Sequence, residues 1–365
     1  MEIAIIGGGN GCFAAAADLA EKGHRVRWWR RNGESFRQIL DTQSIQLMDY
    51  QGTRRVKLDL VSLDLSKVLK GAELVVIPLP APVQVEVAVA IAPYLEDGQV
   101  IYLPPGTFGS YIMSKALRDA GCMKEIVFAE TGTLPYLARK RGPDLVAISA
   151  RATRLPTGVF PAKATEYALH VLKQAFPVVE PLQDALDGAL MNAGPVIHPP
   201  LILLNAGPIE HFPAWDIHNE GTQPAIRKVH MALDNERIAV REAFGYRAPH
   251  FPLVDHYHPE GEEWMYGRRV HEKLVDSKDW HEHLDLYTHR YMREDVACGL
   301  AFLVSLAQYC GQQVPVAAGL LAVASAILGE DLRNTGRTLE NLGLALVNRV
   351  TLKALLQEGL GGVYE

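Results

Sequence analysis

Glycines, a basic pair and an isolated histidine are the residues whose types and spacing could carry chemistry. The glycines form GGGNGCFAAAA at residues 7–17, after an apolar run and before an alanine-rich segment. Glycine permits a tight turn and close backbone approach, and a helix beginning there presents N–H groups and its positive dipole end to phosphate. Cys12 replaces the third glycine of the usual fingerprint. The residues expected to bind a dinucleotide are Gly7, Gly9, Asn10 and Gly11.

The basic pair follows the next apolar run. HRVRWW, at residues 24–29, leads into Arg30, Arg31 and Asn32. Dinucleotide sites for NAD usually carry an acid here, which binds the ribose hydroxyls and would repel a 2′-phosphate. Arginine instead pairs with phosphate through a fork of donors. These three residues therefore indicate a cofactor site that favours NADP, with NAD as the alternative. The structural alternative is a solvated basic turn.

Two polar side chains lie in strongly apolar surroundings. His198 belongs to NAGPVIHPPLILLNAGPIE, and Asp295 to HRYMREDVACGL, where a charge-free segment begins. A carboxylate that orients an imidazole makes a general acid–base pair. From these residues alone the structural alternatives stay open, namely a packed core histidine and an aspartate that caps a helix.

The elements that must position these groups alternate in the first half of the chain. Helical patterns separate apolar runs at residues 2–7, 24–29, 73–80, 99–106 and 125–131. Such alternation implies βαβ units, and continuous apolar runs imply a parallel sheet covered on both faces. A hairpin is also expected, with strands at residues 46–49 and 56–61 around a turn at residues 50–52.

Beyond about residue 183 the pattern is helical. The charge-free stretch at residues 296–329 is interrupted by GQQVPV, which predicts two buried helices and a turn. A membrane span would need about 20 uninterrupted apolar residues. The expected fold class is α/β, with an N-terminal Rossmann-type doubly wound sheet in residues 1–182. An all-helical C-terminal domain, residues 183–365, carries the substrate and catalytic groups.

Composition narrows the classes of function. The 365 residues suffice for about two domains, and 36 Lys plus Arg against 42 Asp plus Glu give a net charge of −6. This acidity argues against nucleic acid or anionic lipid as a partner. The N-terminus, MEIAIIGG, lacks the basic region of a signal peptide, and the four cysteines are scattered. These features predict a cytoplasmic protein without membrane association.

Histidines crowd the loop-rich stretch between residues 250 and 289. Two HxH spacings occur there, but alternate residues of a strand point to opposite sides, and no cysteine accompanies them. We therefore expect no metal, and interpret the histidines as a polar, aromatic wall, some of it contacting an anionic substrate. They are His250, His256, His258, His271, His281, His283 and His289.

Segments along the whole chain resemble the NAD/NADP octopine/nopaline dehydrogenase family of opine dehydrogenases. GGGNGCFAAA resembles the family's GxGNGG-type opening, VIHPPLILLNAG its HPxxxLLN segment, and HRYMREDVACGL its RYxxEDVxxGL segment. TGRTLENLGL, at residues 335–344, resembles the C-terminal GRTLExLGL. The matches keep the family's order from residue 7 to residue 344. Cys12 and Arg30 depart from the family pattern, and both departures concern the cofactor.

The resemblance implies an oxidoreductase acting on CH–NH donors, which reductively condenses an amino acid with a 2-oxo acid using NADP(H). It assigns His198 as the catalytic histidine and Asp295 as the carboxylate that holds its tautomer. Arg290 is the candidate for a substrate carboxylate, because its fork of donors suits one. The active site is expected in a cleft between the two domains.

Other interpretations remain open. A 2-dehydropantoate-reductase-like or β-hydroxyacid dehydrogenase, acting on a C=O substrate, resembles this domain order but relies on a catalytic lysine. The helical half is poor in lysine near the candidate motifs. A non-catalytic NADP(H) sensor is the third interpretation, which loss of His198 or Asp295 would have favoured. The charge-free helices at residues 296–329 also exceed what a small domain must bury, so we expect a homodimer.

Overall fold

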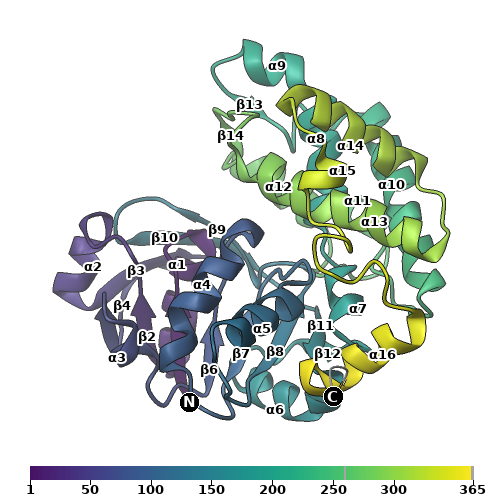
Figure 1. The fold of residues 1–365 in the computed structure, drawn as a ribbon. Helices are drawn as coiled ribbons and strands as arrows, with labels where there is room; N and C mark the ends of the chain where they lie inside the picture. Colours follow the sequence, from purple (N-terminus) through teal and green to yellow (C-terminus); the bar gives the residue numbers. More distant parts are fainter. Residues whose placement is uncertain (259, 363–365) are drawn as a thin grey trace. The chain divides into compact units, whose positions relative to one another are not determined.

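The computed structural model describes residues 1–258 and 260–362, which form two compact units (Figure 1). The first unit consists of Met1–Leu79, Val83–Ala189 and the C-terminal segment from Lys353. The second consists of Pro80–Pro82 and Leu190–Leu352. The domain boundary expected between residues 182 and 183 stays a prediction.

The first unit is built on an eight-stranded sheet in the order β12-β11-β8-β7-β6-β1-β2-β5. Neighbouring strands from β8 to β5 run parallel, whereas β11 runs antiparallel to β8. This order confirms the predicted Rossmann-type sheet. The strands are β1 (Glu2–Ile6), β2 (Arg25–Trp29), β5 (Leu60–Ser62), β6 (Leu74–Val76), β7 (Val100–Leu103), β8 (Val127–Thr131), β11 (Leu155–Phe160) and β12 (Val179–Pro181).

A second sheet of the same unit has the order β4-β3-β10-β9. Its strands are β3 (Ser44–Asp49), β4 (Gly52–Lys57), β9 (Tyr136–Lys140) and β10 (Leu145–Arg151). A hairpin of β3 and β4 was predicted, but its second strand was wrongly placed at residues 56–61, whereas β4 spans Gly52–Lys57. The chain leaves this sheet at Leu58, and the Asp59 N–H donates to the Val26 carbonyl oxygen. The following residues therefore form β5 of the large sheet.

Both faces of the large sheet are covered. One face packs Ile3, Ile5 and Trp28 into a core shared with α1, α6 and the second sheet, while Ala4 and Ile6 are fully buried on the other face. The helices are α1 (Asn10–Glu21), α2 (Arg37–Thr42), α3 (Leu65–Leu69), α4 (Gln84–Ile91), α5 (Gly109–Asp119), α6 (Thr165–Ala175), α7 (Ala185–Ala189) and α16 (Arg349–Glu358), whose residues up to Leu352 belong to the second unit. Short 3-10 helices are η1 (Glu34–Phe36), η2 (Ala81–Val83), η3 (Ala92–Tyr94), η4 (Ala162–Ala164) and η6 (Leu360–Gly362).

In its described residues the second unit is helical, as predicted, apart from a two-stranded pair of β13 (Trp215–Asp216) and β14 (His281–Glu282). The charge-free stretch forms two helices separated by a turn at Gly311, where φ is 74°. Within the described residues, no helix is long and apolar enough to cross a membrane. The helices are α8 (Gly194–Leu203), α9 (Ala206–His211), α10 (Pro224–Ala243), α11 (Leu253–Tyr257), α12 (Val270–Ser277), the π-helical η5 (Tyr291–Leu300), α13 (Ala301–Cys310), α14 (Pro315–Leu328) and α15 (Leu332–Thr335).

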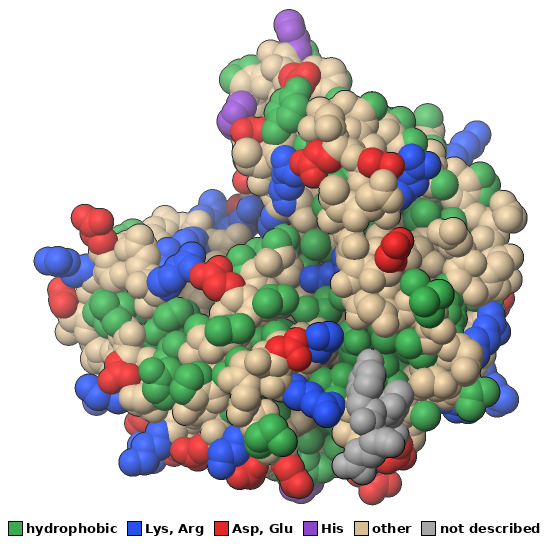
Figure 2. Space-filling view, in the orientation of Figure 1, with side chains coloured by type: hydrophobic (Ala, Val, Ile, Leu, Met, Phe, Trp, Pro, Cys, Tyr) green, Lys and Arg blue, Asp and Glu red, His purple; other side chains and the backbone are tan. Residues whose placement is uncertain are grey.

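Charges of both signs are interspersed over the face of the molecule drawn in Figure 2. A protein that binds a polyanion gathers Lys and Arg on one surface instead. This face therefore carries no gathered basic surface.

Candidate active site

The glycine loop joins β1 to α1. The Gly7 N–H donates to the Trp29 carbonyl oxygen at 2.9 Å, and Trp28 Nε1–H donates to the Gly7 carbonyl oxygen at 2.8 Å. Gly7 has φ of 120°, and a Cβ there would overlap Leu79. A Cβ on Gly9 would instead meet nothing within 4 Å. The loop is thus fixed to the end of β2, while its backbone at the start of α1 is open, which fits a dinucleotide pyrophosphate.

Cys12 replaces a glycine without disturbing the loop. Its side chain is fully buried, and its thiol lies 3.6 Å from the Ile6 carbonyl oxygen. Burial raises the pKa of Cys12 to about 12, so the thiol stays protonated. At Gly11, a Cβ would come within 2.8 Å of Leu134 and 3.0 Å of Pro78. Close packing of α1 therefore requires glycine at position 11 but accepts a small thiol at position 12.

The basic residues after β2 have different surroundings. Arg30 lies against the glycine loop, because a Cβ on Gly8 would overlap its guanidinium. Arg31 forms an exposed ion pair with Glu86. Asn32 Oδ1 accepts the N–H groups of residues 34 and 35, at 3.0 and 3.4 Å, and so shapes the start of η1. Of these three residues, Arg30 is the one that the structure places at the loop.

The two catalytic candidates meet within the second unit. His198 Nδ1, on α8, lies 2.7 Å from Asp295 Oδ2, on η5. Two glycines allow this close approach of the helices: a Cβ on Gly194 would overlap Asp295, and a Cβ on Gly299 would overlap Pro195. The His198 and Asp295 side chains are 15% and 7% exposed. The carboxylate is thus positioned to hold Nδ1 as the protonated nitrogen of a neutral imidazole.

Aromatic rings fix the plane of the His198 imidazole. The Tyr291 ring stacks on it at 3.8 Å between centroids and 23° between planes. The His218 ring lies edge-on at 6.1 Å. Arg290 places its guanidinium carbon 5.2 Å from the Tyr291 ring, and its side chain is 48% exposed. Roles for His198 and Arg290 were predicted from the sequence, whereas no local pattern marked Tyr291, whose ring contacts both.

A buried histidine on α10 binds the backbone of α8. His230 Nε2–H donates to the Ile197 carbonyl oxygen at 2.9 Å, and the Tyr257 hydroxyl lies 3.0 Å from His230 Nδ1. Burial lowers the pKa of His230 to about 4, so the ring is neutral and Tyr257 donates to it. Pro199 and Pro200 lie inside this helix and lack N–H donors. No local sequence signal marks His230, because its role depends on the packing of α10 against α8.

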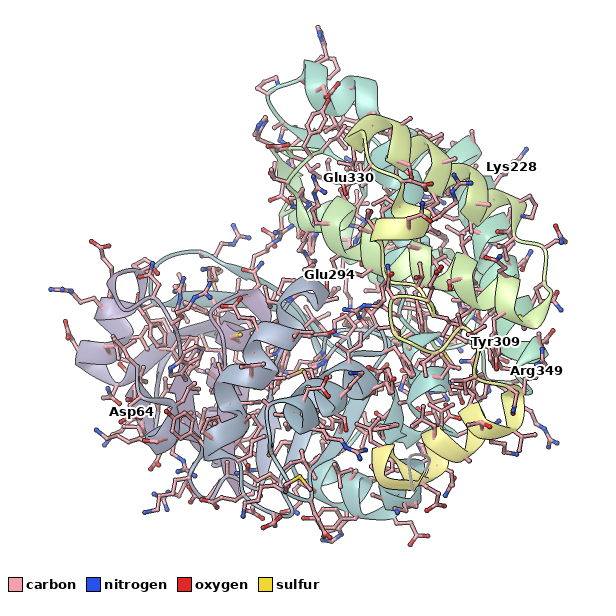
Figure 3. The ribbon with its side chains drawn as sticks, in the orientation of Figure 1. Asp64, Lys228, Glu294, Tyr309, Glu330 and Arg349 are labelled. Atoms are coloured by element: carbon pink, nitrogen blue, oxygen red, sulfur yellow. The ribbon has the colours of Figure 1, made fainter. Side chains whose placement is uncertain are left out.

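Acidic residues in η5 are held in a poorly solvated environment. Burial raises the pKa of Asp295 to about 7. Burial, reinforced by repulsion from Asp295, also raises the pKa of Glu294, which is labelled in Figure 3, to about 7. Glu294 Oε1 accepts the Ala81 N–H at 3.0 Å, and Oε2 lies 3.7 Å from Arg290 Nη1. Two adjacent buried carboxyls oppose each other's ionisation, so near pH 7 the site readily holds a proton.

Glu294→Gln should flatten the pH dependence of stability. A glutamate whose folded pKa lies near 7 stabilises the fold fully below its unfolded pKa, and this contribution is lost as pH rises through 7. The loss should reach roughly 2–3 kcal/mol for this group. Urea unfolding at pH 5 and pH 8 measures it. The exposed Glu340→Gln serves as the control, and equal pH slopes for wild type and Glu294→Gln would contradict the assignment.

Within residues 1–258 and 260–362, no group of three or more His, Cys, Asp or Glu could hold a metal ion. His256 and His271 are buried with ring centroids 5.6 Å apart, and burial lowers the pKa of both. Arg227 Nη2 lies 3.3 Å from His271 Nε2 and donates to it. These residues pack with Tyr257, so part of the predicted aromatic wall lies inside the helical unit.

Two family models match different parts of the chain, and curated relatives match nearly its whole length. Residues 181–328 match the family model described as NAD/NADP octopine/nopaline dehydrogenase, alpha-helical domain. Residues 2–127 match that of the NAD-dependent glycerol-3-phosphate dehydrogenase N-terminus. The opine dehydrogenase of Arthrobacter sp. (strain 1C) is 29% identical over 361 residues, covering 97% of this chain and 98% of the relative. Protein ocs of Agrobacterium tumefaciens (strain Ach5) is 27% identical, covering 94% and 95%.

Solved structures share the fold over the same length. Octopine dehydrogenase in complex with NADH and agmatine superimposes with a TM-score of 0.73 at 19% identity, covering 98% of each chain. Yersinopine dehydrogenase with NADP+ bound gives a TM-score of 0.64 at 16% identity, again covering 98% of each chain. The fold therefore accommodates either dinucleotide in these relatives.

Proposed function

We propose that this chain, a member of the NAD/NADP octopine/nopaline dehydrogenase family, is an opine dehydrogenase that condenses an amino acid with a 2-oxo acid. It is an oxidoreductase acting on CH–NH donors, and NAD(P)H supplies the hydride that reduces the C=N bond. The observation that carries the proposed site is the 2.7 Å contact between His198 and Asp295. Because the buried carboxylate of Asp295 binds Nδ1 of the imidazole, Nε2 is the nitrogen that can transfer a proton.

The roles of the side chains follow from this contact. His198 gives a proton to the hydroxyl of the carbinolamine as water leaves, and takes one in the reverse direction. Asp295 holds the tautomer and stabilises the imidazolium that forms. Tyr291 holds the ring plane, and Arg290 binds a substrate carboxylate through its fork of donors. Residues 1–182 serve as the dinucleotide domain and residues 183–365 as the catalytic domain.

A matrix of amino acids against 2-oxo acids, followed by the absorbance of the reduced cofactor, tests the function. Oxidation should require both substrates and yield a secondary amine that joins them. The alternative C=O reductase predicts oxidation with the 2-oxo acid alone, at a rate that added amine does not change. Product mass spectrometry separates an N-(carboxyalkyl) amino acid from a hydroxy acid, and a hydroxy acid as the only product would refute the proposal.

We also propose that NADP(H) is preferred over NAD(H), on the strength of Arg30 beside Gly8. Arg30→Asp should raise the apparent KM for NADPH and improve the use of NADH, because the new carboxylate repels a 2′-phosphate and can bind ribose hydroxyls. Steady-state kinetics with both cofactors measure this change. Arg31→Asp, whose parent side chain is paired with Glu86, is the control and should shift cofactor preference less. Equal affinity of the wild type for NADH and NADPH would overturn the preference.

A homodimer is proposed from the charge-free helices. α14 leaves Ala318, Gly319, Ala322 and Val323 exposed, with Val323 at 46%. Light scattering at micromolar concentration should give twice the monomer mass, and Val323→Glu should shift it toward the monomer. A monomer mass for the wild type would reject the proposal.

The cytoplasm is proposed as the location of the enzyme. Cys12, Cys122, Cys298 and Cys310 are all free thiols, as expected in a reducing compartment.

A further inference from the structure

The Arg30 side chain packs against the glycine loop at Gly8, in space that the Cβ of any other residue at position 8 would occupy. Gly8 precedes α1, and a Cβ at this position would overlap the Arg30 guanidinium. Arg30 Nη1 donates to the Ser35 carbonyl oxygen at 3.2 Å, and its guanidinium carbon lies 5.8 Å from the Phe36 ring. These contacts hold the cation beside the Gly8 backbone.

A second cation reaches the same loop from the other sheet. Lys140 is the last residue of β9, and its N–H donates to Asn10 Oδ1 at 3.0 Å. Its ammonium lies 3.4 Å from the Gly8 carbonyl oxygen and 4.8 Å from the Phe13 ring centroid. Asn10, one of the predicted cofactor residues, therefore also positions the backbone of Lys140.

Among the residues that the structure describes, no carboxylate pairs with either cation. Across the described part of the chain, the contacts of Arg30 and Lys140 are with carbonyl oxygens and rings, whereas neighbouring Arg31 pairs with Glu86. Partial burial and, second, the like charge of Arg30 lower the pKa of Lys140. An anion between them would relieve this repulsion.

We propose that Lys140 is a second cofactor-specificity residue, which together with Arg30 binds the 2′-phosphate of NADP(H). The inference rests on the proposed NADP(H) preference. A 2′-phosphate carries up to two negative charges near pH 7, so two cations match it. Arg30 follows β2, where this fold places the ribose, while the pyrophosphate belongs to the N–H groups at the start of α1. Both cations lie at Gly8, two positions before α1 begins at Asn10.

Calorimetric titration with NADPH and NADH, which differ only in the 2′-phosphate, tests the role of Lys140. Lys140→Gln should weaken NADPH binding by roughly 10- to 100-fold, the scale of one charge-assisted hydrogen bond, and NADH binding by less than about twofold. Lys140→Arg should recover most of the NADPH affinity. Lys57→Gln, an exposed lysine on β4 of the same sheet, is the control and should change neither affinity.

The outcomes separate this inference from the proposed preference. Equal weakening of NADPH and NADH by Lys140→Gln would assign Lys140 to the pyrophosphate and overturn the inference. An unchanged NADPH affinity would overturn it as well. If wild-type protein binds both dinucleotides equally, the preference itself fails, and with it the premise. If the wild type prefers NADPH and the Lys140→Gln variant keeps this preference, the role of Lys140 is refuted and the proposed NADP(H) preference stands.

Discussion

We expect His198→Ala to lower kcat by about 10²–10⁴-fold, the usual range for loss of a general acid–base group, and to leave NADPH affinity nearly unchanged. The affinity is retained because the glycine loop belongs to the first unit, whereas His198 belongs to the second. Single-turnover rates and calorimetric NADPH binding, each corrected for the folded fraction, measure the two quantities.

His211→Ala is the matched control, because His211 is an exposed histidine at the end of α9 in the same unit. It should retain wild-type turnover. If His198 were only a packed core histidine, its replacement would lower the melting temperature and barely alter turnover per folded molecule. That result would remove His198 from the mechanism.

Asp295→Asn should also reduce kcat strongly, because a neutral amide cannot stabilise the imidazolium and can select the wrong tautomer. The limb of the pH–rate profile that reports imidazole protonation should move to lower pH, since the charge that favours the imidazolium is gone. A merely structural role would leave the profile in place. The exposed Asp276→Asn, on α12, is the control.

The double variant His198→Ala/Asp295→Asn distinguishes one catalytic unit from two independent groups. It should be little slower than His198→Ala alone, because Asp295 acts through the imidazole. Multiplicative losses would mean that Asp295 contributes by another route and would contradict the 2.7 Å contact as the source of its effect.

Local signals made the first half of the fold predictable. The β1–α1 loop can be predicted from a short local segment, since the turn, the open backbone at Gly9 and the start of the helix that follows all lie within about a dozen positions. Continuous apolar runs identified the strands, because a parallel sheet buried on both faces needs them. The second strand of the β3–β4 hairpin was misplaced, since apolar residues alternate with Lys57 and Asp59 from Val56 onward and extend the strand pattern while the chain passes between sheets.

The catalytic candidates were found through resemblance to a family, and their contact was not readable from spacing. His198 and Asp295 are 97 positions apart, and an isolated histidine in an apolar helix is usually a core residue. Gly194 offered a usable signal, because a glycine at the start of a helix permits close approach of another element. Its partner could not be named until α8 and η5 were seen packed together.

The sequence by itself determined the doubly wound sheet, the glycine loop, the basic end of β2 and the helical second half. These are encoded in short-range periodicity and residue type. Only the tertiary structure decided that Tyr291 stacks on His198, that His230 supports Ile197, and that Lys140 reaches Gly8 from 132 positions away. Such contacts depend on which surfaces pack against each other, and packing is set by the whole fold, so no local pattern records it.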